Sequence, residues 1–294
     1  MRAGLPPVAR CGAKTLGYNR AEEAPINLRT QIERIEDGSR QTRDDQLAVE
    51  EPLEIRLDGK SLAVIMRSPG NDEELAAGFL YTEAIIKSGE ELLSVTHRHD
   101  PKNPDLANVV DAVTTEGIDV SKRGWQRNFV SASSCGLCGK LTIESVRLQV
   151  PSVRRDKLAV TSELLLSLPE KMRAEQAGFD ETGGIHAAGL FDADGHLLVV
   201  REDIGRHNAV DKVVGAAVLA GETPLSGRIL MVSGRASFEI VQKALMARIP
   251  LVAAVSAASS LAVELADSCS MGLVGFMRED ALNVYAGGYR IKGA

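Results

Sequence analysis

The sequence predicts an α/β fold, and three observations support this prediction. After Pro151, short apolar runs alternate with segments of helical period. The runs at 228–235 and 250–256 have continuous apolar centres, as expected of strands that are buried on both faces of a parallel sheet. Two further apolar runs, 272–278 and 281–287, follow each other closely and predict a final antiparallel pair. Together these features predict a sheet with parallel members inside a three-layer domain.

Composition limits the domain count and the class of protein. The length of 294 residues predicts two domains. The content of 44% hydrophobic and 25% charged residues predicts that they are globular, with hydrophobic cores. A net charge of -6 argues against a protein that binds nucleic acid mainly by electrostatics. No apolar run is long enough for a membrane span, and no secretion signal is evident, so we expect a cytoplasmic protein without membrane contact.

The first half of the chain predicts a tail followed by a small domain. Residues 1–45 lack a sustained apolar period and predict a flexible N-terminal tail. Residues 46–150 predict a smaller α+β domain, with a hairpin turning at Asp58-Gly59 and a helix from Asn71 or Asp72 to Ser88-Gly89. Less regular, β-rich sequence continues to about 130, and the domain ends in a Cys-x-x-Cys loop.

The second domain is predicted over residues 151–294. Its first helix is expected at about 161–177, followed by a hairpin around Asp194-Gly195. Three more helical segments alternate with the apolar runs, at 205–221, 237–249 and 260–271.

The Cys-x-x-Cys pair, Cys135 and Cys138, is the first candidate for chemistry. Such a turn can lower the pKa of one thiol, with Lys140 as a nearby cation, and the thiolate is the form that attacks sulfur. A zinc site and a cycling disulfide are alternatives. A second close cysteine pair for zinc is missing, because Cys11 and Cys269 stand alone, and only His97 and His99 offer further ligands. We therefore predict no bound metal and place Cys269 in the core.

Loops of small residues after the strands are the second candidate. The segments 201–212, 233–239 and 256–264 each lead into a predicted helix, and helix N-termini at the carboxyl edge of an α/β sheet favour phosphate. The side chains placed to meet an anion are Arg206, His207, Arg235, Ser237 and Ser260. Alternatively, the serines only cap helices and the arginines are solvated. The three loops together favour a phosphate-bearing ligand.

Other polar residues near these loops have structural and functional interpretations. His186 is expected to be a buried, hydrogen-bonded imidazole, although Gly183 and Gly184 would let a ligand approach. Glu202 and Asp203 are expected to cap the following helix rather than to catalyse.

Five motifs in order carry a family resemblance. The stretches SSCGLCGK, TGGIHAAGL, REDIGRHNAVDKVVG, SGRASFEIVQKA and AVSAASSLAVELA closely resemble the formate dehydrogenase accessory sulfurtransferases, the FdhD family. The likeness runs from about 48 to 290. It implies a sulfurtransferase that takes persulfide sulfur from a cysteine desulfurase and passes it to the molybdenum cofactor, bis-molybdopterin guanine dinucleotide, before formate dehydrogenase receives it.

The resemblance also implies site residues and a fold. It makes Cys135 the persulfide carrier and Cys138 the second thiol. It implies a cytidine-deaminase-like fold for the C-terminal domain and a homodimer. It places cofactor contacts in the loop near the last strand pair, at Phe276, Met277, Arg278, Glu279, Asp280 and Ala281. One departure is SAASS, where relatives commonly have a central proline, and this puts the rigidity of that loop in doubt.

Two other functions compete with sulfur transfer. A zinc-dependent deaminase needs H-x-E followed downstream by P-C-x-x-C, whereas the only Cys-x-x-Cys of this chain precedes the α/β region. A cofactor-binding chaperone without sulfur chemistry is the second alternative, and it predicts that the cysteines are dispensable.

Overall fold

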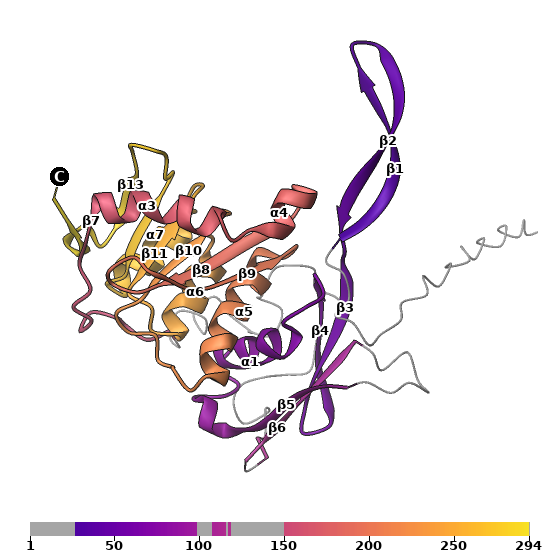
Figure 1. The fold of residues 1–294 in the computed structure, drawn as a ribbon. Coiled ribbons are helices and arrows are strands. Elements are labelled where there is room, and N and C mark those ends of the chain that lie inside the picture. Colours follow the sequence, from indigo (N-terminus) through magenta and orange to yellow (C-terminus); the bar gives the residue numbers. More distant parts are fainter. Residues whose placement is uncertain (1–26, 99–107, 116, 119–149, 294) are drawn as a thin grey trace, which may run out of the picture.

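In the computed structural model, residues 27–98, 108–115, 117–118 and 150–293 are described. Their strands form two main sheets, and helices pack between the sheets and on the far side of the larger one (Figure 1). Cys11, Cys135 and Cys138 lie outside the described residues.

The larger sheet has six strands in the order β13-β12-β11-β10-β8-β9. Its parallel members are β10 to β12, while β8 runs antiparallel to β10, and β13 runs antiparallel to β12. The predicted parallel strands and final antiparallel pair are therefore confirmed. The bounds are β8 His186–Phe191, β9 Leu197–Asp203, β10 Ile229–Val232, β11 Leu251–Ala254, β12 Gly272–Gly275 and β13 Asn283–Ala286.

Helices cover both faces of this sheet, which confirms its three-layer arrangement. Helix α3 (Ser162–Arg173) lies on one face, and α5 (Arg206–Leu219), α6 (Phe238–Met246) and α7 (Ser260–Ser268) lie on the other. In β10, Ile229 and Met231 pack in the cluster of α3, whereas Leu230 and Val232 pack in the cluster of α5 to α7. The apolar run is continuous because successive strand side chains point to opposite faces and both faces are buried.

The N-terminal part contributes a four-stranded sheet and one helix. The sheet has the order β4-β3-β6-β5, and the predicted Asp58-Gly59 turn joins β3 to β4 with both residues at positive φ. Helix α1 packs against this sheet through Leu75 and Ala76. The bounds are β3 Glu51–Leu57, β4 Lys60–Arg67, α1 Asp72–Thr82, β5 Leu92–Arg98 and β6 Val109–Thr114.

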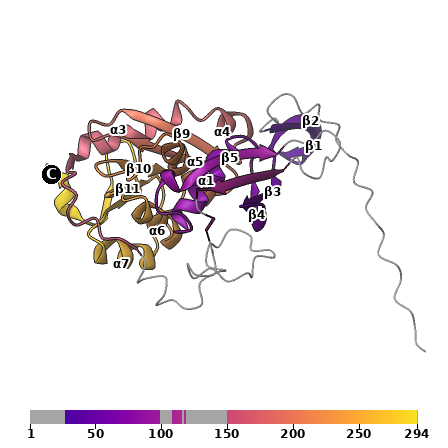
Figure 2. The same cartoon turned by 90° about the horizontal axis from the view of Figure 1, so that it is seen from below.

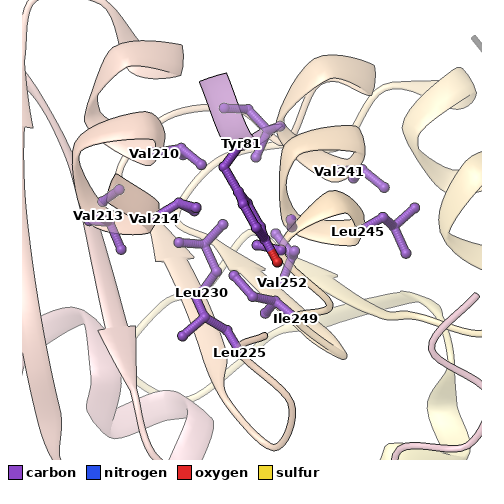
Figure 3. Packing of buried hydrophobic residues seen from close by; sticks show 14 of the residues in the cluster. Tyr81, Val210, Val213, Val214, Leu225, Leu230, Val241, Leu245, Ile249 and Val252 are labelled. Atoms are coloured by element: carbon purple, nitrogen blue, oxygen red, sulfur yellow. The ribbon is translucent and has the colours of Figure 1, made fainter. Parts of the chain in front are cut away.

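Helix α1 also packs on α5, so one hydrophobic cluster contains residues of both halves. In both views the two helices lie side by side (Figure 1, Figure 2). Figure 3 shows Tyr81 of α1 among apolar side chains from α5, α6 and the larger sheet. One hydrophobic cluster therefore spans the predicted boundary at residue 150, while the N-terminal sheet also has a cluster of its own.

The prediction of a flexible tail up to residue 45 is wrong for the part of it that the structure describes. Strands β1 (Asn27–Glu36) and β2 (Ser39–Ala48) form a regular antiparallel hairpin, which projects away from the body (Figure 1). Its turn is Asp37-Gly38, with both residues at positive φ. The hairpin is mostly exposed on both faces, so it lacks the apolar alternation by which strands are recognised.

Two helix ends differ from the prediction. Helix α1 stops at Thr82 rather than near Ser88, because Ala84 adopts positive φ and Ile85 turns into the core, where its N–H donates to Leu80 O (2.8 Å). The segment predicted as one helix over 161–177 is α3 followed by a separate short helix, α4 (Ala177–Thr182).

Short elements complete the described chain. Buried Arg290 donates to Val153 O (2.8 Å), Leu158 O (3.2 Å) and Ser270 O (3.0 Å), and so ties the segment after residue 150 to the C-terminus. Cys269 is buried in the core, as predicted. The short elements are the 3-10 turns Gly89–Glu91 and Gly288–Arg290 and the strands β7 (Val160–Thr161) and β14 (Ile291–Lys292). None of the described helices has the length and apolar character needed to cross a bilayer.

Candidate functional site

The predicted anion-binding loops lie together at one edge of the larger sheet. The parallel strands β10, β11 and β12 end at this edge, and antiparallel β8 begins there, since Ala187 N donates to Ser233 Oγ (2.9 Å) and Ser233 N donates to Ala187 O (2.9 Å). Helices α5, α6 and α7 start from the same edge. Three helix N-termini therefore point their free N–H groups toward one region.

His186 and Arg206 flank the same glycine. A Cβ at Gly234 would lie 3.4 Å from His186 Nδ1 and 3.8 Å from Arg206 Cδ. Burial lowers the pKa of half-buried His186, the Arg206 charge lowers it further, and Asp203 opposes these effects. The Nε of Arg206 is a buried donor with no hydrogen-bond partner among the described residues. An unpaired buried donor in a native fold calls for an explanation, and an anionic ligand would supply the missing acceptor.

His207 lies at the head of α5 and faces the head of α6. Its Nε2 is 3.3 Å from Ser237 Oγ and 3.8 Å from Glu239 Oε2. Burial and the nearby charges of Lys243 and Arg206 lower the pKa of His207 from 6.5 to about 3. The imidazole is therefore neutral at physiological pH and acts as a hydrogen-bonding group rather than a cation.

The capping alternative for the two serines is wrong. Ser237 occupies the N-cap position of α6 but makes no side-chain cap bond, and its hydroxyl faces His207 instead. In α7 the capping residue is Ser259, which accepts from Ala262 N (3.3 Å), while Ser260 is exposed in the first turn. Among the arginines, the solvated alternative fits exposed Arg235 better than Arg206, which is only partly exposed.

The two acids before α5 have separate structural roles. Glu202 accepts from Gly178 N (2.8 Å) and Phe179 N (2.9 Å), so it caps α4 rather than α5. Asp203 is fully buried and accepts from Gly205 N (2.8 Å), just before α5 begins. Gly205 is itself the N-cap residue, so Asp203 binds the N–H that precedes the first turn, and neither acid caps α5 as predicted.

The loop between β12 and β13 lies at the same edge. Phe276 is 41% exposed at positive φ, and its N–H donates to Ser256 O (3.0 Å) in the loop after β11. Arg278 Nη1 donates to Val255 O (3.0 Å). Met277 packs in the core at 2% exposure, which leaves its side chain little surface for a ligand. The remaining residues of the predicted loop, Glu279, Asp280 and Ala281, are exposed.

A buried network of one ion pair and several hydrogen bonds, here called the buried lock, joins the N-terminal half to this edge. It consists of Ser68, Asp203, Asn208 and Lys212. Asp203 Oδ2 accepts from Lys212 Nζ (2.8 Å) and from Ser68 N (3.2 Å). Lys212 also donates to Ser68 O (2.9 Å), and Asn208 Nδ2 donates to Met66 O (2.8 Å). Sequence analysis missed Ser68 and Lys212. The local sequence signal is the RSPG turn between a hairpin and a helix, but nothing in that turn indicates contact with residue 203.

A separate acidic turn lies at the other end of β8. Asp192, Asp194 and His196 approach one another closely enough to share a metal ion, and His196 Nδ1 is 3.0 Å from Asp192 Oδ2. The turn is largely exposed and is remote in the sheet from the edge that carries His186. His97, considered as a zinc ligand, has its Nε2 3.4 Å from Asp72 Oδ2.

The arrangement suits an anionic ligand. The Arg206 donor, exposed Arg235 and the uncapped heads of α5 and α6 supply positive potential and free N–H groups. Neutral His186 and His207 add hydrogen-bonding groups without a charge requirement. These residues fit an anionic group such as phosphate.

Comparison with known proteins shows the family to which the chain belongs. Residues 48–292 match the profile of the FdhD/NarQ family. A Streptomyces coelicolor protein named Sulfur carrier protein FdhD is 50% identical over 270 residues, covering 90% of this chain and 96% of the relative. A Sulfolobus acidocaldarius protein of the same name is 41% identical over 263 residues, covering 90% of this chain and 98% of the relative.

A solved structure shares the fold. It is the crystal structure of a protein assigned as a formate dehydrogenase accessory protein from Desulfotalea psychrophila. It superimposes with a TM-score of 0.72 at 24% identity, over 91% of this chain and all of the other. At this identity the likeness supports the fold alone.

Proposed function

Because this chain belongs to the FdhD/NarQ family, we propose that it is a sulfur carrier that serves formate dehydrogenase. In detail, it takes sulfur from a cysteine desulfurase as a persulfide and delivers it to bis-molybdopterin guanine dinucleotide before that cofactor enters the dehydrogenase. The cofactor is cargo here rather than a resident group. We further propose that the protein acts in the cytoplasm as a homodimer, and that residues 151–294 form a cytidine-deaminase-like domain, an idea supported by the three-layer arrangement around a mixed sheet.

Cys135 carries the sulfur in this proposal. Its thiolate attacks the outer sulfur of the desulfurase persulfide, so that a new S–S bond forms on Cys135 and the desulfurase thiolate leaves. Cys138 thiolate then attacks the inner sulfur of the Cys135 persulfide. This step forms a Cys135–Cys138 disulfide and releases the outer sulfur as hydrosulfide to the cofactor. The dithiol supplies the two electrons, and a cellular thiol reductant restores it.

The residues of the sheet edge hold the cargo. Arg206 and Arg235 face phosphate, while His186, His207, Ser237 and Ser260 supply neutral hydrogen-bonding groups. The loop 276–281 borders the same edge, with Phe276 exposed for contact. The observation that carries this assignment is the unpaired buried Nε of Arg206 beside His186.

Mass spectrometry tests the sulfur step. After incubation with a desulfurase and cysteine, the peptide with Cys135 should gain the mass of one sulfur atom, and the gain should disappear in Cys135→Ala. Cys138→Ala should still form the persulfide but release sulfur slowly when no reductant is added. Normal rates of release by Cys138→Ala over many turnovers would refute the disulfide step.

A complementation experiment tests the alternative that the protein is only a cofactor-binding chaperone. If a double Cys135→Ala, Cys138→Ala variant fully restores formate dehydrogenase activity in cells that lack the wild-type protein, then the protein only holds the cofactor. Stoichiometric zinc in the purified protein would instead support the deaminase alternative.

A further inference from the structure

A basic patch lies at the end of the larger sheet opposite the anion-binding loops. It forms where residues 152–157 lie beside the segments that precede β10 and β11. Gly227 N donates to Asp156 Oδ2 (2.8 Å), and Arg248 Nη1 donates to Ser152 O (3.4 Å). The patch has five cations, all exposed except the half-buried arginine before β10: Arg154, Arg155, Lys157, Arg228 and Arg248.

The cations of the basic patch lack acidic partners. Elsewhere on the described surface several arginines bind carboxylates, as Arg29 does with Asp44 and Arg173 with Asp180. By contrast, none of the five cations forms an ion pair with an acid of the described residues. The one acid within 152–157, Asp156, has a side chain that is only 10% exposed. In a chain of net charge -6, this concentration of unpaired positive charge suits a negatively charged partner.

An exposed tyrosine borders the basic patch. Tyr289 is 66% exposed, and its hydroxyl donates to Ser270 O (2.8 Å). The same carbonyl accepts from Arg290 Nη2 (3.0 Å), and Arg290 also donates to Val153 O (2.8 Å), next to Arg154. Tyrosine and arginine are enriched at protein interfaces and dominate their binding energy. The combination, in a chain of negative net charge, favours a protein partner over a nucleic acid.

The position of the basic patch indicates which protein binds there. The described chain resumes at Val150 after the segment that contains Cys135 and Cys138, and Val150 packs on the hydrophobic cluster that spans both halves. Cys135 lies 15 residues before Val150, so it stays within roughly 55 Å of Val150 even in a fully extended chain. A partner at the patch therefore lies within reach of Cys135 and leaves the anion-binding loops free for the cargo.

We propose that the basic patch docks the sulfur donor, a protein that presents an acidic surface beside its persulfide. The cations attract that surface, and Tyr289 packs against it. The inference rests on the proposed function, because it assigns the surface used in the first step of sulfur transfer. In that step the Cys135 thiolate attacks the outer sulfur of the donor persulfide, and the donor thiolate leaves.

Reversal of two charges tests the proposal in the full-length protein. The double variant Arg154→Glu, Arg155→Glu should fold normally, because neither side chain bonds to a described residue. With a purified cysteine desulfurase and cysteine at about 50 mM salt, its second-order rate of persulfide formation on Cys135 should fall at least about tenfold. At about 0.5 M salt the wild-type rate should fall toward that of the variant, because salt screens exposed charges.

The double variant Arg40→Glu, Arg43→Glu is the matched control. It has the same net charge, but its changes lie in β2, on the hairpin that projects away from the body (Figure 1). Its rate of persulfide formation should stay within about twofold of wild type. An unchanged rate in the patch variant, or an equal fall in both double variants, would overturn the docking role.

Two further measurements separate docking from indirect effects. Cysteine persulfide, a small donor that needs no docking surface, should load both double variants as fast as wild type. GDP, the probe for the nucleotide end of the cargo, should bind all three proteins equally, because the anion-binding loops lie at the other end of the sheet. Slow loading of the patch variant by cysteine persulfide would show an effect on the thiol itself and would refute docking.

The outcomes also separate this inference from the function on which it rests. If neither the desulfurase nor cysteine persulfide loads wild-type protein, sulfur carriage on Cys135 fails and the docking role fails with it. If the desulfurase loads all three proteins equally, only the docking role fails. Normal loading of the patch variant together with lost binding of a single-stranded RNA oligonucleotide would assign the basic patch to nucleic acid instead.

Discussion

His207 is held neutral by its surroundings at the junction of α5 and α6. Burial is the largest cause, and the positive charges of Lys243 and Arg206 add to it. The lowered pKa means that the folded protein binds a proton at this site less readily than the unfolded chain does. This group therefore stabilises the fold fully above pH 6.5, and that contribution is lost as the pH falls from 6.5 toward about 3.

Acid sensitivity should accordingly decrease when His207 is replaced. Between about pH 8 and about pH 5, the titration of this one residue should remove about 2 kcal/mol from the free energy of unfolding. His207→Gln should lose less over that interval by about this amount. Urea denaturation of both proteins at the two pH values measures the difference, and equal losses would show that the imidazole titrates normally.

Arg206 gives a second prediction at the residue scale. Arg206→Met removes the unpaired buried donor, so GDP affinity should fall by more than about tenfold, while the free energy of unfolding should change little. Arg228→Met is a control at the start of β10, at the opposite end of that strand from the site. Equal GDP affinity in wild type and Arg206→Met would remove this residue from the site.

Sequence alone predicted the residues that the structure brings together at the sheet edge. Arg206, His207 and Ser237 were found because small-residue loops at the carboxyl ends of strands have a general role in α/β proteins. Ser68 and Lys212 were missed because their contacts with Asp203 depend on the tertiary fold. No local pattern encodes such contacts.

At the scale of elements, α1 and α5 cross at two glycines. A Cβ at Gly78 would lie 1.8 Å from Asp211 O, and a Cβ at Gly215 would lie 1.7 Å from Glu74 O. The helices therefore approach more closely than any side chain allows. This contact fixes the N-terminal half against the helix that carries Arg206 and His207.

Alanine at either glycine should force the helices apart. Gly78→Ala or Gly215→Ala should cost at least about 3 kcal/mol of unfolding free energy, because backbone atoms rather than flexible side chains stand in the way. Gly288→Ala is the control, since its Cβ would meet only Val284 Cγ1 at 3.8 Å. Chemical denaturation measures all three, and a loss below about 1 kcal/mol at both helix positions would contradict the close crossing.

The buried lock predicts strong coupling between Asp203 and Lys212. Either Asp203→Ala or Lys212→Met alone leaves an unpaired buried charge and should cost about 3–5 kcal/mol. The double variant should be destabilised by clearly less than the sum of the two. Additive losses in a double-mutant cycle would mean that the two side chains do not act as a pair.

Sequence patterns predicted most of the helices and strands, but not all of their boundaries. The strands of the larger sheet were recognisable because both of their faces are buried. The early end of α1 was not, because it depends on Ile85 turning into a core built from distant residues. The β1–β2 hairpin was missed since its polar, exposed strands lack alternation, although its Asp37-Gly38 turn resembles the Asp58-Gly59 turn that was recognised.

At the scale of the whole molecule, the main hydrophobic cluster spans both halves of the chain, and the β1–β2 hairpin projects away from them as an arm. The predicted α/β class and the layers of the larger sheet are confirmed. The core extends across residue 150 because α1 packs on α5, a long-range pairing that sequence patterns do not reveal. The β1–β2 arm stands apart from this core, with its base near α4, where Asn27 donates to Glu181.

The arm should be dispensable for the stability of the body. A chain that begins at Ala48 keeps the whole region matched by the family, and it should unfold cooperatively with nearly the same midpoint as the full chain. Thermal unfolding by circular dichroism compares the two. A large drop in the midpoint would show that the arm contributes to the core.

The central claim, that the Cys135 thiol carries sulfur to a cofactor held at the sheet edge, is tested most directly by following the sulfur atom. The protein is loaded by a desulfurase with radiolabelled cysteine, freed of small molecules, and mixed with the cofactor and apo formate dehydrogenase. We predict that label appears in the dehydrogenase with wild-type protein and not with Cys135→Ala. Equal labelling of the dehydrogenase by the two proteins would contradict the account.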